Sequence, residues 1–169
     1  MLGIRDIPSI AEFRRLKKLI PEIPAEQASL AIRLGSTTSR LFERLDAYLA
    51  RDGLSFGRVA VMLQLVRYRS TGLTPSELAD KIGVTRATIT GLLDRLAREG
   101  FVERADHPSD RRSHVVHLTK AGFAKLAWVL PRHAGRVRTV LSAITAEERK
   151  VLVGVVAKIE SALETLPEP

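Results

Sequence analysis

A cluster of small and polar residues flanked by arginines, between Arg86 and Arg95, is the part of the sequence best suited to contact a ligand. If the stretch is helical, about 100° of rotation per residue gathers these side chains opposite the apolar ones. A solvated helix face usually carries long Lys and Glu side chains, whereas Ala, Gly and Thr allow the backbone to approach a groove closely. The pattern therefore favours a helix that reads DNA over one that is merely solvated. This face contains Arg86, Ala87, Thr88, Thr90, Gly91, Asp94 and Arg95.

Two short helices separated by a tight turn are predicted to position this face. Thr74 and Glu77 form a capping-box pattern with a proline between them, so the first helix should start at Thr74. Gly83 can adopt the left-handed conformation that ends a helix, and Thr85 can cap the next one. Gly100 marks the end of this second helix. Its core-facing residues recur at helical spacing and are Ile89, Leu92, Leu93 and Leu96.

A β-hairpin is predicted immediately after the second helix. The segments 101–104 and 113–118 are β-prone, and residues 105–112 between them contain a proline and two aspartates. We therefore expect an eight-residue tip. Asp110, Arg111 and Arg112 lie in this tip, so two guanidinium groups project beside the candidate recognition helix, within reach of phosphates or a minor groove. A hairpin in this position is typical of a wing.

In their order along the chain, these motifs resemble the winged helix-turn-helix of the multiple-antibiotic-resistance regulator (MarR) family of bacterial transcription factors. The family pattern contains a Leu-Thr-x-x-Glu-Leu-Ala helix start, a Gly-[Phe/Leu/Trp]-Val-x-Arg exit, an Asp-x-Arg wing tip and a Leu-Thr-x-x-Gly return. The matching segments here are 73–79, 100–104, 110–112 and 118–122. The chain departs from the family at Gly91, where relatives often carry arginine, so one of their base or phosphate contacts is expected to be missing.

The resemblance implies a sequence-specific transcription regulator, expected to be a repressor relieved by a small ligand. Its expected partner is double-stranded DNA with a pseudo-palindromic site, bound by a homodimer that presents two recognition helices to successive major grooves. In the family, the aspartate matching Asp94 pairs with the last arginine of the wing tip, here Arg112, so Asp94 and Asp110 are expected to orient the wing. The residues expected to contact DNA are Thr74, Thr85, Arg86, Ala87, Thr88, Thr90, Gly91, Arg95, Arg111 and Arg112.

Two other interpretations stay open. The chain could be a DNA-architectural winged-helix protein without an effector, which would occupy many diffuse genomic sites where a regulator occupies a few discrete ones. It could also be a degenerate winged helix that contacts proteins. The intact Asp110-Arg111-Arg112 tip argues against this last interpretation.

Helices are also predicted before the winged module. A capping-box pattern at Ser9 starts a short amphipathic helix that ends near Ile20, and a long helix is predicted over residues 25–52. Ser55 should cap the following helix. The apolar face of that helix is predicted to contain Val59, Met62, Leu63 and Val66.

Two helical segments are predicted after the wing. Thr119 should cap a helix that Pro131 kinks or interrupts, and Thr145 begins the last helix with another capping box. The first helix, the long helix and the last two helices together carry more apolar surface than a small winged module can bury, so a second copy is expected to cover it. The expected fold is mainly α with a small β-hairpin wing, in a single protomer. Its expected parts are dimerising helices over 1–53, the winged helix-turn-helix over 54–120 and dimerising helices over 121–169.

The composition and the net charge support binding to a polyanion, but they do not show which part of the chain binds it. The chain has 169 residues, 45% of them hydrophobic, and a net charge of +8. Residues 1–73 carry twelve Lys/Arg against seven Asp/Glu, whereas residues 74–120 carry eight against seven. No stretch is long and apolar enough to span a membrane, and no secretion signal is evident, so the cytoplasm is expected. The absence of cysteine excludes thiol-based redox sensing.

Other kinds of site are weakly indicated. The four histidines, His107, His114, His117 and His133, have no metal-site spacing, and no catalytic constellation is present, so we expect no metal, no cofactor and no enzyme activity. The family resemblance implies a pocket for an aromatic or phenolic effector between the helical scaffold and the winged module. The residues expected to line it are Tyr48, Phe56, Arg58 and Trp128, with Phe42 and Tyr68 as further candidates.

Overall fold

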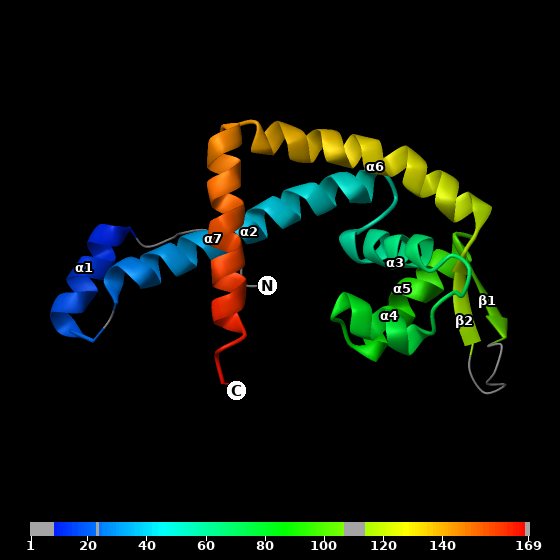
Figure 1. Cartoon of the computed structure of the whole chain (residues 1–169), viewed down its shortest axis with the longest axis horizontal. Coiled ribbons are helices and arrows are strands. Elements are labelled where there is room, and N and C mark those ends of the chain that lie inside the picture. Colours follow the sequence, from blue (N-terminus) through cyan, green and yellow to red (C-terminus); the bar gives the residue numbers. More distant parts are fainter. Residues whose placement is uncertain (1–8, 23, 107–113, 168–169) are drawn as a thin grey trace. The chain divides into compact units, whose positions relative to one another are not determined.

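Seven helices and one two-stranded hairpin occupy the part of the chain that the structure, a computed structural model, describes (Figure 1). The described residues are 9–22, 24–106 and 114–167. The chain divides into two compact units, Met1–Val129 and Leu130–Pro169. In order, the elements are α1 (Ile10–Leu19), α2 (Ala25–Arg51), α3 (Phe56–Arg67), α4 (Pro75–Ile82), α5 (Arg86–Arg98), β1 (Val102–Asp106), β2 (His114–Leu118), α6 (Lys120–Leu141) and α7 (Ala146–Leu163).

Hydroxyl side chains begin the helices where the sequence predicts. The hydroxyls of Ser55 and Thr85 accept hydrogen bonds from backbone N–H groups in the first turns of α3 and α5. Ser9, Thr74 and Thr145 do the same and complete capping boxes with a glutamate three residues later. Each such cap satisfies a backbone donor that the helix cannot, which is worth about 1 kcal/mol. The predicted starts are therefore confirmed.

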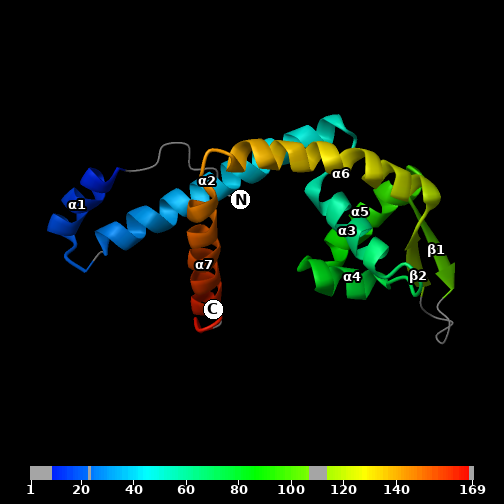
Figure 2. The same ribbon diagram turned by 45° about the horizontal axis from the view of Figure 1, so that its top comes forward.

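The core of the winged module forms where α3, α4, α5 and β2 meet (Figure 2). Val61 and Met62 of α3 are fully buried, together with Leu78 of α4, Leu96 of α5 and Val116 of β2. The apolar face predicted for α3 is partly wrong. Leu63 and Val66 are exposed, while Val61 and Leu65 are buried beside the correctly predicted Val59 and Met62. Because α3 packs against three other elements, its buried side chains extend beyond a single helical stripe.

The wing is an antiparallel hairpin whose pairing runs from Val102 opposite Leu118 to Asp106 opposite His114. The strand therefore includes Ala105 and Asp106, which the sequence placed in the tip, because each finds a cross-strand partner in β2. Leu73 adds a short bridge to Val116 on the other side of β2. The predicted tip residues Asp110, Arg111 and Arg112 lie outside the described residues.

The helix that follows the wing is continuous through Pro131. Of the two expected effects of this proline, the interruption of the helix is therefore wrong, and the kink stays a prediction. A proline inside a helix removes one backbone donor and crowds the preceding turn, at a cost of about 3 kcal/mol. The residues on both sides nevertheless stay helical from Lys120 to Leu141. The boundary between the two compact units falls between Val129 and Leu130, just before the proline.

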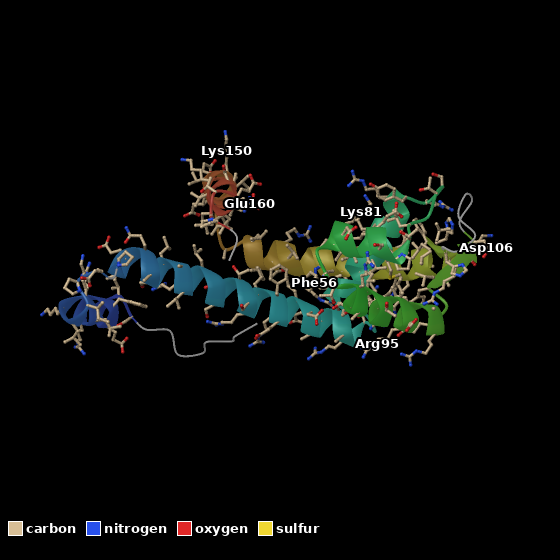
Figure 3. The ribbon with its side chains drawn as sticks, turned by 90° about the horizontal axis from the view of Figure 1, so that it is seen from below. Phe56, Lys81, Arg95, Asp106, Lys150 and Glu160 are labelled. Carbon is tan, nitrogen blue, oxygen red and sulfur yellow. The ribbon has the colours of Figure 1, made fainter. Side chains whose placement is uncertain are left out.

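The last helix, α7, exposes all of its residues. In Figure 3, where Lys150 and Glu160 are labelled, the side chains of this helix radiate in every direction. The exposed set includes large apolar residues that follow helical spacing, namely Val151, Leu152, Val155, Val156, Ile159 and Leu163. Among the described residues, no helix is long and apolar enough to cross a membrane.

Candidate nucleic-acid interface

The face of α5 that the sequence predicts to point outward is exposed. Ile89, Leu93 and Leu96 on the opposite side are buried, with Leu92 half-buried, so the helix is oriented as its periodicity predicts. Figure 3 shows the side chains of this helix, with Arg95 labelled. The exposed residues are Arg86, Ala87, Thr88, Thr90, Gly91, Asp94 and Arg95.

Hydroxyl groups at the start of α5 are largely engaged with the helix itself. Thr85 Oγ1 accepts a hydrogen bond from the backbone N–H of Thr88 at 3.2 Å and lies 2.9 Å from Thr88 Oγ1. Thr90 Oγ1 donates to the carbonyl of Arg86 at 2.9 Å. These bonds fix the rotamers of the threonines and leave Arg86 and Arg95 as the long side chains available to reach outward.

Thr74 occupies the equivalent position at the start of α4. Its Oγ1 donates to Glu77 Oε2 at 2.9 Å, and the backbone N–H of Glu77 donates back to Oγ1 at 3.2 Å. At the other end of α4, Lys81 Nζ lies 4.6 Å from the ring centre of Tyr68. A hydrogen bond with Lys81, assisted by its charge, holds the pKa of the Tyr68 phenol below its ordinary value. Lys81 is therefore a cation held at the edge of the helix-turn-helix.

Gly91 leaves open space in the middle of the α5 face. A Cβ placed on this glycine would have no atom of the described residues within 4 Å. The small residue is therefore not required by packing inside the protomer. The position can admit either a longer side chain or the close approach of a ligand.

Asp94 connects the recognition helix to the wing through an arginine that the sequence did not single out. Its Oδ1 atom lies 2.8 Å from Nη2 of Arg104 on β1, and both side chains are about half exposed. The expected partner, Arg112, lies outside the described residues, so the Asp94–Arg112 pair stays a prediction. Arg104 belongs to the Gly-Phe-Val-x-Arg segment, but its role depends on the direction in which β1 leaves the helix, which no local pattern reveals.

A second ion pair holds the other end of α5. Arg58 Nη1 lies 2.6 Å from Oε1 of Glu99, the residue that ends α5, and the Arg58 side chain is 13% exposed. The pair connects the first turn of α3 to the end of the recognition helix. Arg58 was expected to line an effector pocket, and here its guanidinium is engaged by a carboxylate.

The other residues expected to line the effector pocket contact different neighbours. Phe56 packs edge-to-face on Phe42, with 5.2 Å between ring centres. The Tyr48 ring lies beneath Arg51, and the Trp128 ring lies beneath Lys125. The pocket assignment of Tyr48, Phe56, Arg58 and Trp128 thus stays a prediction.

The start of α6 is fastened to the root of the wing. Thr119 Oγ1 donates to the carbonyl of Gly100 at 2.7 Å and accepts from the backbone N–H of Gly122 at 3.0 Å. A Cβ on Gly122 would overlap the carbonyl oxygen of Phe101 and crowd Leu118. The helix therefore approaches the wing backbone at a distance that only glycine permits.

The two histidines of the hairpin, His114 and His117, have different neighbours. His114 Nδ1 lies 3.4 Å from Asp106 Oδ1 across the hairpin, whereas His117 pairs opposite Glu103, and His107 lies outside the described residues. Within residues 9–22, 24–106 and 114–167, no group of three or more His, Cys, Asp or Glu side chains is placed to hold a metal ion.

Comparison with known proteins places this geometry among DNA-binding regulators. The family model described as MarR family matches residues 61–114. The chain is 32% identical over 152 residues to the HTH-type transcriptional repressor YetL of Bacillus subtilis, covering 90% of this chain and 91% of that protein. It is 30% identical over 145 residues to the HTH-type transcriptional regulator PecS of Dickeya dadantii, covering 85% and 87%.

Solved structures show the same fold. Sco3205, a MarR family transcriptional regulator from Streptomyces coelicolor in complex with DNA, matches with a TM-score of 0.75 and 28% identity over 83% of this chain and 89% of that one. MarR from Escherichia coli in its apo form matches with a TM-score of 0.65 and 27% identity, covering 75% and 94%.

Proposed function

The chain belongs to the MarR family of DNA-binding transcription regulators, and we propose that it is a homodimeric repressor whose two α5 helices read the halves of a pseudo-palindromic site. The proposed activity is binding without catalysis. A regulator of chromosomal genes would work in the cytoplasm.

The exposed face of α5 is the observation that carries this proposal. Its small side chains are Ala87, Thr90 and Gly91, with Arg86 and Arg95 as the long donors. Its one carboxylate, Asp94, is paired with Arg104 and so repels a phosphate less than an unpaired one would. Such a face allows the helix backbone to enter a major groove while arginines reach base edges or phosphates.

The wing would add a contact outside the major groove. We propose that Arg111 and Arg112 reach the backbone or the minor groove of the DNA and that Asp110 and Asp94 orient them, as the family resemblance implies. Arginine suits this role because its planar fork can bind a carboxylate and still keep its charge. Arg112→Ala should then lose about 1–3 kcal/mol of DNA affinity.

The apolar residues of α7 support dimerisation. A helix with Val151, Val155 and Ile159 exposed would leave a large apolar surface in water unless a second protomer covers it. In the other compact unit, α1 also exposes apolar residues, because Phe13 is buried while Leu16 and Leu19 are exposed. The dimer would place the two α5 helices about 34 Å apart along the DNA.

A cavity beside the winged module supports a small carboxylate as effector. Its volume is about 180 Å³, and its lining includes Leu65, Phe123, Arg69 and Lys120. Arg69 lies over the Phe123 ring, 5.9 Å from its centre. An aromatic acid could therefore place its ring against the apolar side chains and its carboxylate between two cations. These residues differ from those that the sequence suggested.

Sequencing the genomic fragments retained by the purified protein tests the proposal. We expect a few discrete sites with two-fold symmetry, and Arg86→Ala with Arg95→Ala should abolish their enrichment. As a matched control, Arg138→Gln with Lys150→Gln removes the same charge at exposed positions that are not part of α5. Diffuse recovery of many unrelated fragments by the parent protein would instead favour the architectural interpretation.

The proposed binding of an aromatic acid as effector is tested by separate measurements. Benzoate and hydroxybenzoates at millimolar concentration should raise the melting temperature and weaken operator binding, and Arg69→Gln should suppress both effects. A thermal shift that survives Arg69→Gln would place the ligand elsewhere.

A further inference from the structure

Four arginines form a straight row along α2, on a face that the winged module does not use. They are separated by seven, four and seven residues, and 18 residues correspond to five full turns of a helix. The four side chains therefore lie within about 40° of one another around the helix axis and span about 27 Å along it. We call this set, Arg33, Arg40, Arg44 and Arg51, the α2 arginine row.

The row is exposed and has no anionic partner in the part of the chain that the structure describes. All four residues are exposed, and none has a described carboxylate within the 4.0 Å of an ion pair. The Arg51 guanidinium lies over the Tyr48 ring, a contact that leaves its charge unneutralised. Four like charges along one line repel one another, so an external anion would relieve that repulsion.

The acidic residues of α2 are directed elsewhere. Asp46 Oδ1 accepts a hydrogen bond from the backbone N–H of Phe56 at 2.7 Å. Glu26, which precedes Arg33 by seven residues and so lies on the line of the row, is 3.5 Å from Arg14 of α1. Glu43 lies about 80° around the helix from the row. The row is therefore a purely basic surface. The carboxylate of Glu26, at the N-terminal end of the row, is paired with Arg14 of α1.

We propose that the α2 arginine row is a second, sequence-independent binding surface for the phosphate backbone of duplex DNA. The charge distribution supports this occupant. Residues 74–120 are almost neutral, with eight Lys/Arg against seven Asp/Glu, whereas residues 1–73 carry twelve against seven. Sequence-independent affinity comes from cations that displace counterions from phosphates, so the row can supply what the winged module lacks.

The chemistry of the row matches phosphodiesters. All four basic residues on this line of the helix are arginines and none is a lysine. The planar guanidinium group of arginine can donate two hydrogen bonds to the oxygens of one phosphate. A 27 Å length of duplex carries about sixteen phosphates on its two strands, more than the four guanidinium groups of the row. The residues between the arginines on the same line are Thr37 and Ala47, which offer no apolar anchor for a bilayer. The surface goes beyond the proposed operator recognition and does not depend on it.

Salt-dependent binding of a random-sequence duplex tests the proposal. Arg40→Gln with Arg44→Gln removes two charges without introducing a poor helix former. The slope of log Kobs against log salt should become shallower by about 2 for each row in contact with the duplex, since each lost phosphate contact contributes about 0.9. The matched control, Arg138→Gln with Lys150→Gln, should leave the slope unchanged. The same slope in the row variant and the control would overturn the proposal.

Four further measurements identify the occupant. In a background of Arg86→Ala and Arg95→Ala, which removes the α5 contacts, the row variant should still lower the slope, and no effect there would overturn the proposal. Arg40→Lys with Arg44→Lys should restore the slope.

Sedimentation should show the parent oligomeric state in the row variant; a shift to monomer would assign the row to a protein interface instead. Loss of binding to phosphatidylserine vesicles with unchanged DNA binding would assign it to lipid.

Discussion

Asp94 of α5 and Arg104 of β1 form an ion pair with 2.8 Å between Oδ1 and Nη2, joining the recognition helix to the wing. The two residues are ten positions apart, and both side chains are about half exposed. A pair in this setting stabilises the fold by at most about 1 kcal/mol. The main effect of the pair is therefore to set the direction in which the wing extends from α5.

Replacing Asp94 should weaken DNA binding although it removes a negative charge near DNA. In Asp94→Ala the Arg104 guanidinium loses its carboxylate, so this side-chain link between the hairpin and α5 is lost. We expect operator affinity to fall about three- to tenfold at matched salt, with a change of less than about 1 kcal/mol in unfolding free energy. Fluorescence anisotropy and urea denaturation measure the two effects. Tighter binding by Asp94→Ala than by the parent would show that Asp94 acts only as a repelling charge.

The elements around this pair were predictable because their signals are local. Thr74 and Thr85 cap their helices through hydrogen bonds to groups three residues away, and Gly83 ends α4 with a φ of +72°. The ion pairs were not predictable in the same way. Arg58 and Glu99 are 41 positions apart, so their contact depends on how α3 crosses α5. The exposure of Leu63 likewise follows from which elements surround α3.

Gly122 should be essential for the junction between α6 and the wing. Because a Cβ at this position would overlap the Phe101 carbonyl oxygen, Gly122→Ala must shift backbone atoms. We expect a loss of about 1–3 kcal/mol in unfolding free energy, the range for overpacking. Gly135→Ala is the control in the same helix, since a Cβ there meets no described atom within 4 Å. It should raise stability by up to about 1 kcal/mol, and equal effects of the two substitutions would refute the steric argument.

The exposed apolar face of α7 should hold the dimer together. Val155→Glu with Ile159→Glu places two charges in that face, and we expect dissociation to monomer or aggregation at micromolar concentration. Lys150→Glu with Lys158→Glu is the control, because it adds two carboxylates to the same helix at positions that are already polar. Sedimentation velocity measures both. A double Val155/Ile159 variant that stayed a folded dimer would place the protomer interface elsewhere.

Gly91 should mark a DNA contact that this chain lacks. The position is exposed on α5, and a Cβ there meets no described atom within 4 Å. The resemblance to the family pattern implies that an arginine is often found there. Gly91→Arg should raise the unfolding free energy by about 0.5–1 kcal/mol, because glycine is a poor helix former. It should also tighten binding to random-sequence duplex and steepen the salt slope by about 0.9 for each α5 helix in contact with the DNA, the value for one added phosphate contact. Gly91→Ala separates the two effects, since it should reproduce the stability gain without the gain in affinity. If Gly91→Arg binds DNA more weakly than Gly91→Ala at low salt, the added side chain collides with the duplex. In that case Gly91 allows the α5 backbone to lie close to the groove. A small residue at this position is then required for DNA binding, and its lack of a side chain costs no contact.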